Sequence, residues 1–494
     1  MKKTKLLCVV LAAIMAFSTL AIGVSAAEGI AKSDNVVFVA NSGSDEAAGT
    51  AAAPVQSMQK AVEKLAATGG VIVVMGNVNV TPDNSIMPEH NGTITVTSYY
   101  DGVDYRAKIN AGDATGARLV MTNSSKKAFA LQGDYVFDYL NITIPDSASK
   151  NCIIAGYYHN VTFGANFATL FEGVDGTPWY TGTFGTESGS RTYPPIFLMG
   201  QNVSDVGIEG DVKVSHDVVV NIAGGIWQSA RIGDRDIPVR NTLDSKMTIN
   251  VSGGQFTQWT AQYDSMNTNL CLMALYQACT SENFVGTINV TGGLIHGEIG
   301  GFGTYGSASY GDAVENGSIV INVLGGTFDR DYQAFGPVIQ PSQYLPFGTA
   351  GLTFGEKVSV TVNIDNSKVT LGGTCPFFTI LGREEHIKIY VNMTEKNEDW
   401  IIGDDIPAAD IKYGPLNVQA PTTDAPVVTD APVVTEAPTV TDAPVVTDAP
   451  VVTTAAPVQP EPTPSTGDAS LMVVFAAAAA ICLAAVVVIK KREN

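Results

Sequence analysis

Residues 221–227 read NIAGGIW, and the same phrase returns as NVSGGQF at 250–256, NVTGGLI at 289–295 and NVLGGTF at 322–328. Its template is Asn, a β-branched residue, any residue, two glycines, any residue and a large apolar residue. The first glycines of successive phrases lie 29, 39 and 33 residues apart. Periods of about 20–50 residues are typical of stacked architectures, because one repeat cannot bury its own apolar face and must pack against its neighbours.

The residues before each glycine pair alternate in character. Val218, Val220 and Ile222 share one face, with Val219 and Asn221 on the other. This period of two predicts a strand with one buried face. The glycine pair predicts a turn, because glycine adopts positive φ without steric cost. The large apolar residue is expected to return to the core, and the four Asn side chains to stack on the outer face.

A strand–helix–strand unit precedes the repeats. Val36–Val39 is a short apolar strand, Ser57 can cap a helix, and Val71–Val74 is the next strand after Gly69-Gly70. The helix would bury an apolar stripe made of Met58, Ala61, Val62 and Leu65.

This unit resembles the N-terminal end of right-handed parallel β-helix proteins, the pectate-lyase-like group. The resemblance is carried by Val39, Gly43-Ser44-Asp45, Gly49-Thr50, Pro54, Ser57, Ala61-Val62 and Gly69-Gly70. It implies that residues 35–80 form a cap whose helix covers the open end of the stack, which an exposed strand edge needs. The resemblance concerns fold, since this fold hosts lyases, hydrolases, adhesins and phage fibres.

Alternating segments continue on both sides of the repeats. Further strands are expected at 93–96, 140–144, 160–163, 358–364 and near 387–393. We therefore predict an all-β fold, a right-handed parallel β-helix over residues 27–417, with the repeats at 211–336. A β-sandwich whose strands happen to repeat stays as the alternative.

Residues 1–26 have the pattern of a secretory signal peptide. Lys2, Lys3 and Lys5 precede an apolar stretch, and residues 24–26 are small enough for cleavage. An uncleaved anchor is the alternative. Either way, the main part of the chain is expected outside the cell.

The composition changes at residues 418–462, where Ala-Pro-Val-Val-Thr-Asp repeats with proline at every sixth position. Frequent proline removes backbone donors and fixes φ, so we expect a disordered, extended stalk. The segment 471–489 is 19 apolar residues, enough for a transmembrane helix, and the basic tail 490–494 indicates a cytoplasmic C-terminus.

Residues 463–468 stand just before that span and contain Pro464, Thr466 and Gly467. A Pro-x-Thr-Gly motif, an apolar span and a basic tail, in this order, resemble the sorting signal of Gram-positive sortase substrates. The resemblance implies cleavage between Thr466 and Gly467 by a sortase and attachment to cell-wall peptidoglycan. The chain would then be a single-pass membrane protein only before sorting. Thr463 stands where the commonest signals carry Leu, and a plain membrane anchor is the alternative.

Charge and cysteine content exclude several classes of function. The chain has 48 Asp and Glu against 28 Lys and Arg, a formal charge of −20. Such a surface repels nucleic acid and anionic lipid, and disfavours a polyanionic sugar unless a divalent cation bridges the two. The cysteines lack the spacing of a zinc site. Cys271 and Cys279 would close a loop if oxidised, or pack as small apolar residues.

Two Asp-Arg-Asp triplets are the candidates for catalysis. They are Asp234, Arg235 and Asp236, and Asp329, Arg330 and Asp331. In the pectate-lyase-like group, acidic residues on the outer face hold Ca²⁺ and an Arg or Lys abstracts the proton next to a uronate carboxylate. The resemblance thus makes Ca²⁺ the one cofactor to consider. The alternative is that both triplets form solvent-exposed ion pairs in loops.

The aromatic residues divide into two groups. Trp227 and Phe256 fill the large apolar position of the repeat and are expected in the core. Others lie in segments with loop character and are candidates for stacking on sugar rings, with loop packing as the alternative: Trp179, Tyr180, Trp259, Tyr263, Tyr305 and Tyr310.

Two functional hypotheses follow. The first is a cell-surface adhesion or display protein that binds glycans or polymers of a host or community through an open face of Asn, Thr and aromatic residues. The second is a polysaccharide lyase or glycoside hydrolase, which would need acidic and basic residues together on one strand face. The repeats show the first pattern.

Overall fold

The computed structural model describes part of the chain, namely residues 29–107, 116–123, 127–145, 152–171, 194–201, 212–235, 241–257, 270–276, 279–303, 313–314, 317–328, 339–340, 353–354, 359–371, 388–397 and 408–418. All of these belong to the compact unit formed by residues 1–425. The predicted signal peptide, stalk, sorting motif and transmembrane segment lie outside the described residues. Within the described ranges, no helix has the length and apolar character that crossing a bilayer requires.

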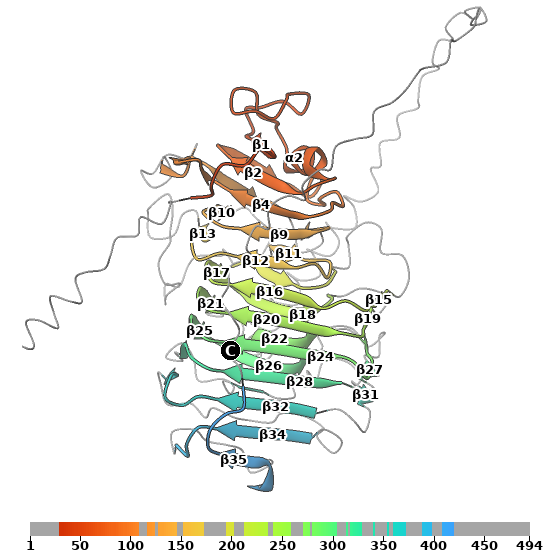
Figure 1. Cartoon of the computed structure of the whole chain (residues 1–494), viewed down its shortest axis with the longest axis vertical. Coiled ribbons are helices and arrows are strands. Elements are labelled where there is room, and N and C mark those ends of the chain that lie inside the picture. Colours follow the sequence, from red (N-terminus) through yellow and green to blue (C-terminus); the bar gives the residue numbers. More distant parts are fainter. Residues whose placement is uncertain are drawn as a thin grey trace, which may run out of the picture. The chain divides into compact units, whose positions relative to one another are not determined.

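Long parallel sheets dominate the described structure (Figure 1). The largest sheet has the strand order β1 (Val36–Val39), β2 (Gly70–Val74), β4 (Thr93–Thr97), β9 (Asp134–Phe137), β12 (Val161–Phe163), β16 (Val218–Ile222), β20 (Lys246–Val251), β24 (Val285–Val290), β28 (Ser318–Val323), β32 (Ser359–Ile364), β34 (Lys388–Met393) and β35 (Ile411–Tyr413). We call it the long sheet. A short 3₁₀ helix, Ala408–Asp410, leads into its last strand.

Four smaller parallel sheets accompany the long sheet. One contains β3 (Asn77–Val80), β7 (Arg118–Met121), β10 (Asn141–Ile144) and β13 (Ala168–Phe171). Another contains β8 (Phe129–Ala130), β11 (Ile153–Ala155), β14 (Ile196–Leu198), β18 (Ser229–Gly233), β22 (Leu270–Tyr276), β26 (Glu298–Gly303) and β30 (Ile339–Gln340).

The two remaining parallel sheets consist of short strands. The first contains β17 (Ile226–Trp227), β21 (Gln255–Thr257), β25 (Leu294–His296), β29 (Thr327–Phe328) and β33 (Thr370–Leu371). The second contains β15 (Lys213–Val214), β19 (Thr242–Leu243), β23 (Cys279–Thr280), β27 (Ala313–Val314) and β31 (Thr353–Phe354). Among described strands, β5 (Tyr99–Tyr100) and β6 (Val103–Asp104) form the one antiparallel pair.

The chain passes through the sheets in a fixed order. Strands β16, β17, β18 and β19 follow one another and lie in four different sheets, and each pairs in parallel with the strand four places later, β20, β21, β22 and β23. We call one such passage a coil. Sandwiches are built from antiparallel sheets, so parallel pairing between coils argues against the β-sandwich alternative. The predicted strands are confirmed, with bounds that shift by one or two residues.

The helix α2 (Met58–Leu65) forms where the sequence predicts it. Ser57 is its N-cap, and its Oγ accepts a hydrogen bond from the Lys60 backbone N–H at 3.2 Å. The four residues of the predicted apolar stripe are all buried. The helix packs on β1 and β2, at the end of the long sheet (Figure 1). It therefore lies at the terminal strand of the stack, where the cap was expected.

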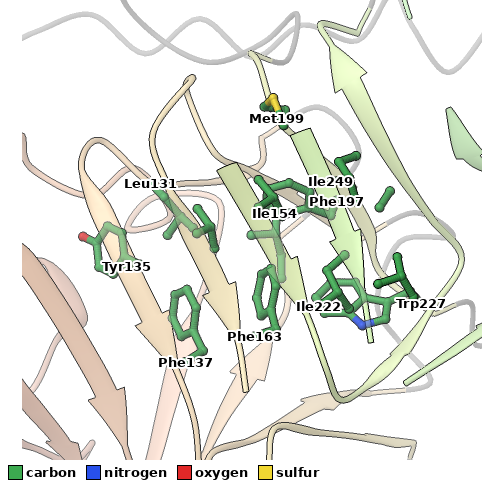
Figure 2. Packing of buried hydrophobic residues seen from close by; sticks show 14 of the residues in the cluster. Leu131, Tyr135, Phe137, Ile154, Phe163, Phe197, Met199, Ile222, Trp227 and Ile249 are labelled. Carbon is green, nitrogen blue, oxygen red and sulfur yellow. The ribbon is translucent and has the colours of Figure 1, made fainter. Parts of the chain in front are cut away.

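Aromatic rings stack along the interior of the long sheet (Figure 2). The rings of Tyr135 and Phe137 lie 5.6 Å apart and nearly parallel, and those of Phe137 and Phe163 lie 5.4 Å apart. Trp227 contacts Phe163 and donates from Nε1 to the Gly224 carbonyl at 2.9 Å. The core positions of Trp227 and Phe256 are thus confirmed. Cys152 and Cys271 are also buried, while Cys279 is half-buried.

The two glycines of the repeat are required for different reasons. The second glycine has positive φ in all four copies, from +75° at Gly254 to +94° at Gly326. The first glycine lies under the preceding coil: a Cβ at Gly253 would stand 2.2 Å from the Ala223 carbonyl oxygen, and one at Gly292 would stand 2.3 Å from that of Ser252. The turn was predicted; the close approach between coils is a finding of the structure.

Candidate functional site

A ladder of asparagine side chains runs across the outer face of the long sheet. Each Nδ2 donates to the Oδ1 of the preceding coil, at distances between 2.7 and 2.9 Å, and the ladder consists of Asn221, Asn250, Asn289, Asn322, Asn363 and Asn392. Asn221 Nδ2 in turn donates to Thr162 Oγ1 at 3.2 Å. The predicted stacking of the four repeat asparagines is confirmed. Asn363 and Asn392 extend it, although no glycine pair follows them.

The centre of this ladder is shielded from solvent. Asn289, Asn322 and Asn363 are only 8%, 5% and 6% exposed, although their side chains point away from the apolar core. Their amides cover one another, since each uses an N–H and the carbonyl oxygen within the ladder. Such a chain of hydrogen bonds satisfies polar groups that would otherwise cost free energy to bury. The ladder therefore keeps the strands in register.

A row of uncharged residues, mostly threonine and valine, runs beside the ladder. Two positions before each Asn, the paired residues are Val219, Thr248, Thr287, Val320, Thr361 and Tyr390. They share the outer face with the ladder because side chains alternate along a strand. Val219 is 37% exposed and the others are half-buried. We call this row and the ladder the Thr/Asn face.

The Thr/Asn face is neutral on a strongly acidic chain. One row toward the strand starts, Asp217 stands opposite Lys246, Lys388 stands at the other end, and uncharged residues lie between the two lysines. Threonine offers both a hydroxyl and a methyl group, so this face can make hydrogen bonds and apolar contacts with a ligand that lies flat across several coils.

The structure places Asp234 of the first triplet inside the molecule. Its side chain is 0% exposed, Oδ1 accepts from the Gln201 backbone N–H at 2.8 Å, and Oδ2 accepts from Asn241 Nδ2 at 3.0 Å. The Tyr158 hydroxyl is close by, and burial, followed by the charge of Asp234, raises the pKa of Tyr158 well above its usual range. Asp234 is therefore not the solvent-exposed residue that the ion-pair interpretation expected.

Of the other five residues of the two triplets, the structure describes Arg235. Arg235 is half-buried, and its backbone N–H donates to the Gln201 carbonyl at 2.9 Å. Asp236 and residues 329–331 lie outside the described residues, as do all six candidate stacking aromatics. In the part of the chain that the structure describes, no group of three or more His, Cys, Asp or Glu is placed to hold a metal ion. A Ca²⁺ site stays a prediction.

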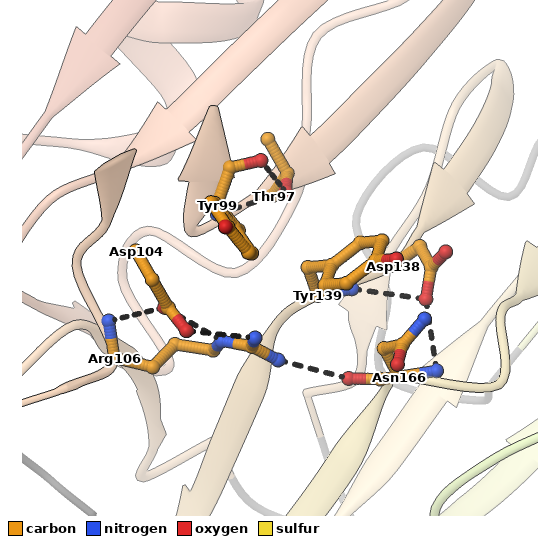
Figure 3. Close-up of polar contacts among 7 residues, drawn as sticks. All are labelled: Thr97, Tyr99, Asp104, Arg106, Asp138, Tyr139 and Asn166. Atoms are coloured by element: carbon orange, nitrogen blue, oxygen red, sulfur yellow. Dashed lines mark hydrogen bonds and ion pairs between the residues drawn. The ribbon is translucent and has the colours of Figure 1, made fainter. Parts of the chain in front are cut away.

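Sequence reasoning missed a cluster of aromatic and charged residues near the N-terminal coils (Figure 3). Tyr99 and Tyr139 lie edge to face, with ring centroids 5.5 Å apart, and the Arg106 guanidinium lies over both rings. The three residues are up to 40 positions apart and carry no common motif. The one local signal is that Asp104 and Arg106 stand two positions apart, and such pairs are too common to identify a site.

No family model, curated protein or solved structure matches this chain.

Proposed function

We propose that this chain is a bacterial surface protein that adheres to neutral extracellular glycans through its Thr/Asn face. The observation that carries the proposal is the alignment of six strands, β16 to β34, which present threonine, valine and amide groups in register. A neutral face on a chain with a charge of −20 suits an uncharged polymer, because the surrounding acidic surface repels polyanions.

We further propose that the stacked coils form a right-handed parallel β-helix. Parallel pairing of every described strand in the stacked sheets supports this fold, and crossover connections between parallel strands are almost always right-handed. Such a stack would display the same face on each successive coil, which suits a ligand with a repeating backbone.

The anchoring part of the proposal rests on the sequence of both ends. A signal peptide would export the chain, a sortase would join Thr466 to peptidoglycan, and the stalk at 418–462 would hold the adhesive part away from the wall. Thr466→Ala is expected to shift the protein from the cell-wall fraction to the membrane fraction of a Gram-positive host. An unchanged distribution would favour the plain membrane anchor.

The binding test uses the full-length chain on an array of neutral and acidic polysaccharides. Replacing Thr287 and Thr361 together by Glu places two charges on the Thr/Asn face and is expected to lower affinity for the bound neutral glycan at least about tenfold, since buried unpaired charge is strongly unfavourable. The control is Thr370→Glu, a single Thr→Glu change at an exposed position of another sheet, which is compared with each of the single variants Thr287→Glu and Thr361→Glu. Equal binding by all of these proteins would reject the Thr/Asn face.

The same assay separates adhesion from catalysis. Binding without change in polymer length supports the adhesive function. Release of shortened or unsaturated products, lost in Arg235→Ala or Arg330→Ala, would instead support a polysaccharide lyase or glycoside hydrolase and reject adhesion as the main activity.

A further inference from the structure

The Arg106 side chain is fixed both by two aromatic rings and by a carboxylate. The Arg106 guanidinium carbon lies 5.2 Å from the centroid of the Tyr139 ring and 5.9 Å from that of Tyr99 (Figure 3). The Asp104 carboxylate accepts two hydrogen bonds from the guanidinium, from Nε to Oδ1 at 2.9 Å and from Nη2 to Oδ2 at 3.0 Å. A two-pronged carboxylate contact fixes the plane of the guanidinium as well as its position.

Tyr139 adopts a backbone conformation that is unfavourable for an aromatic residue. Its φ is +49°, in the left-handed region, where a side chain with a Cβ costs about 1–2 kcal/mol. Asp138 maintains this conformation: its Oδ1 accepts from the backbone N–H groups of Tyr139 and Asn166, each at 2.9 Å. Strain of this kind concentrates at functional sites, where it places a side chain in a required position.

The second tyrosine comes from a segment that departs from the regular stack. The β5–β6 hairpin is antiparallel, and it brings Tyr99 and Asp104 to the same place, with Arg106 two residues beyond. The cluster stays accessible, since the side chains of Arg106 and Asp104 are 16% and 27% exposed and both tyrosines are half-buried. Asp104 and the neighbouring Asp138 outnumber Arg106, so the surroundings of the cluster are slightly negative.

We propose that Tyr99, Tyr139, Arg106 and Asp104 form a second saccharide site, which binds a single neutral pyranose ring. This inference rests on the proposed function, because it concerns the same class of ligand. An aromatic ring offers a face for the C–H groups of a sugar. The Arg106 guanidinium spends three N–H groups on Asp104 and on the Asn166 carbonyl, which leaves two of its five N–H groups for sugar hydroxyls. Asp104 Oδ2 accepts one of these bonds and keeps a lone pair as an acceptor. The local negative charge selects against uronic acids.

The site lies in the N-terminal coils, whereas the Thr/Asn face extends over β16 to β34. A long glycan would therefore make two separable contacts. Variants of either one can be compared without changing the other.

The test measures binding of the full-length chain by titration calorimetry with hexaoses of glucose, mannose and N-acetylglucosamine, and with hexagalacturonate. Tyr139→Gly removes the ring and relieves the backbone strain, so we expect the melting temperature to be kept while affinity for the bound neutral hexaose falls at least about tenfold. Arg106→Lys keeps the charge but loses the planar fork, and is expected to weaken binding about fivefold.

The outcomes distinguish this site from the Thr/Asn face. Affinity unchanged in Tyr139→Gly, or tighter binding of hexagalacturonate than of every neutral hexaose, overturns the saccharide site. If the Thr287 and Thr361 double variant loses binding while Tyr139→Gly does not, the proposed function stands and this inference fails. The reverse result supports the Arg106 cluster and rejects the Thr/Asn face. No binding to any saccharide rejects both.

Discussion

At the residue scale, the repeat depends on having no side chain at two adjacent positions. The second glycine adopts the positive φ that its own turn requires. The first glycine allows close packing between turns, because a carbonyl oxygen of the preceding coil occupies the space that a Cβ would need. A change at the first glycine must therefore move two coils apart, whereas a change at the second strains one.

Gly292→Ala is expected to lower the free energy of unfolding by about 2–4 kcal/mol, because the new methyl group would stand 2.3 Å from a carbonyl oxygen in a packed backbone. Gly76→Ala is the control: its nearest neighbour would be Ala40 Cβ at 3.4 Å, an ordinary contact, and we expect a change below about 1 kcal/mol. Guanidinium unfolding of both variants checks this. Equal stability would mean that the coils separate without cost.

At the element scale, the long sheet is held in register by two different rows. Apolar side chains fill its inner face. On its outer face, the asparagine ladder links neighbouring strands from β16 to β34 by side-chain hydrogen bonds, in addition to the backbone pairing. Since a slip of one residue would turn the apolar row outward and break every amide contact, both rows favour the same pairing.

Asn322→Ala removes the middle of the ladder and leaves Asn289 Oδ1 and Asn363 Nδ2 without these partners at nearly buried positions. We expect a loss of about 2–3 kcal/mol in unfolding free energy, since unsatisfied buried polar groups are costly. Asn392→Ala breaks a single bond at a half-buried end and is expected to cost about 1 kcal/mol. Denaturant midpoints compare the two, and a larger loss at Asn392 would contradict the ladder's role.

At the scale of the whole molecule, histidines gather where three coils enter the long sheet. His159 Nδ1 lies 3.8 Å from Asp134 Oδ1, and His216 Nε2 bonds the Tyr158 carbonyl at 2.9 Å. Burial lowers the pKa of His90 and of His159. The charge of Asp134 opposes this effect at His159, and the neighbouring His216 and His90 add to it. These coils are therefore most stable with neutral imidazoles.

The sign of the pH effect follows from those lowered values. The unfolded chain takes up protons near the ordinary histidine pKa of about 6.5, while the folded chain resists them. Stability is therefore complete above about pH 6.5 and declines as the pH falls through the lowered folded pKa values of His90 and His159. Melting temperatures between about pH 7.5 and pH 5 measure this, well above the titration of Asp244, whose pKa is lowered to about 2 by Lys213.

The control for this effect is His159→Gln, which keeps a polar side chain that does not titrate. We expect a smaller fall in melting temperature toward acid pH than in the unchanged chain. A melting temperature that rises on acidification, or an identical decline in the variant, would show that the histidines do not carry the effect.

The parts that could be predicted from sequence are those with local periodicity. The strand at 218–222, the capped helix at 58–65 and the stacking of the four repeat asparagines depend on neighbours in the chain or on identical repeats that must align. Asn392 was not predicted to join the ladder, because the prediction relied on the glycine pair. The ladder needs only an outward-facing Asn in the right register.

By itself, the amino-acid sequence determined the alternating strands before the glycine pairs, the apolar face that they bury, the capped helix and the turns at the glycine pairs. Only the tertiary structure decided that Asp234 is buried between Gln201 and Asn241, and that Arg106 meets Tyr99 and Tyr139. The physical reason is range. Alternation and glycine turns act within a few residues, whereas Gln201 reaches Asp234, and Tyr139 reaches Arg106, from a neighbouring coil. Those distances exist only once the coils have stacked.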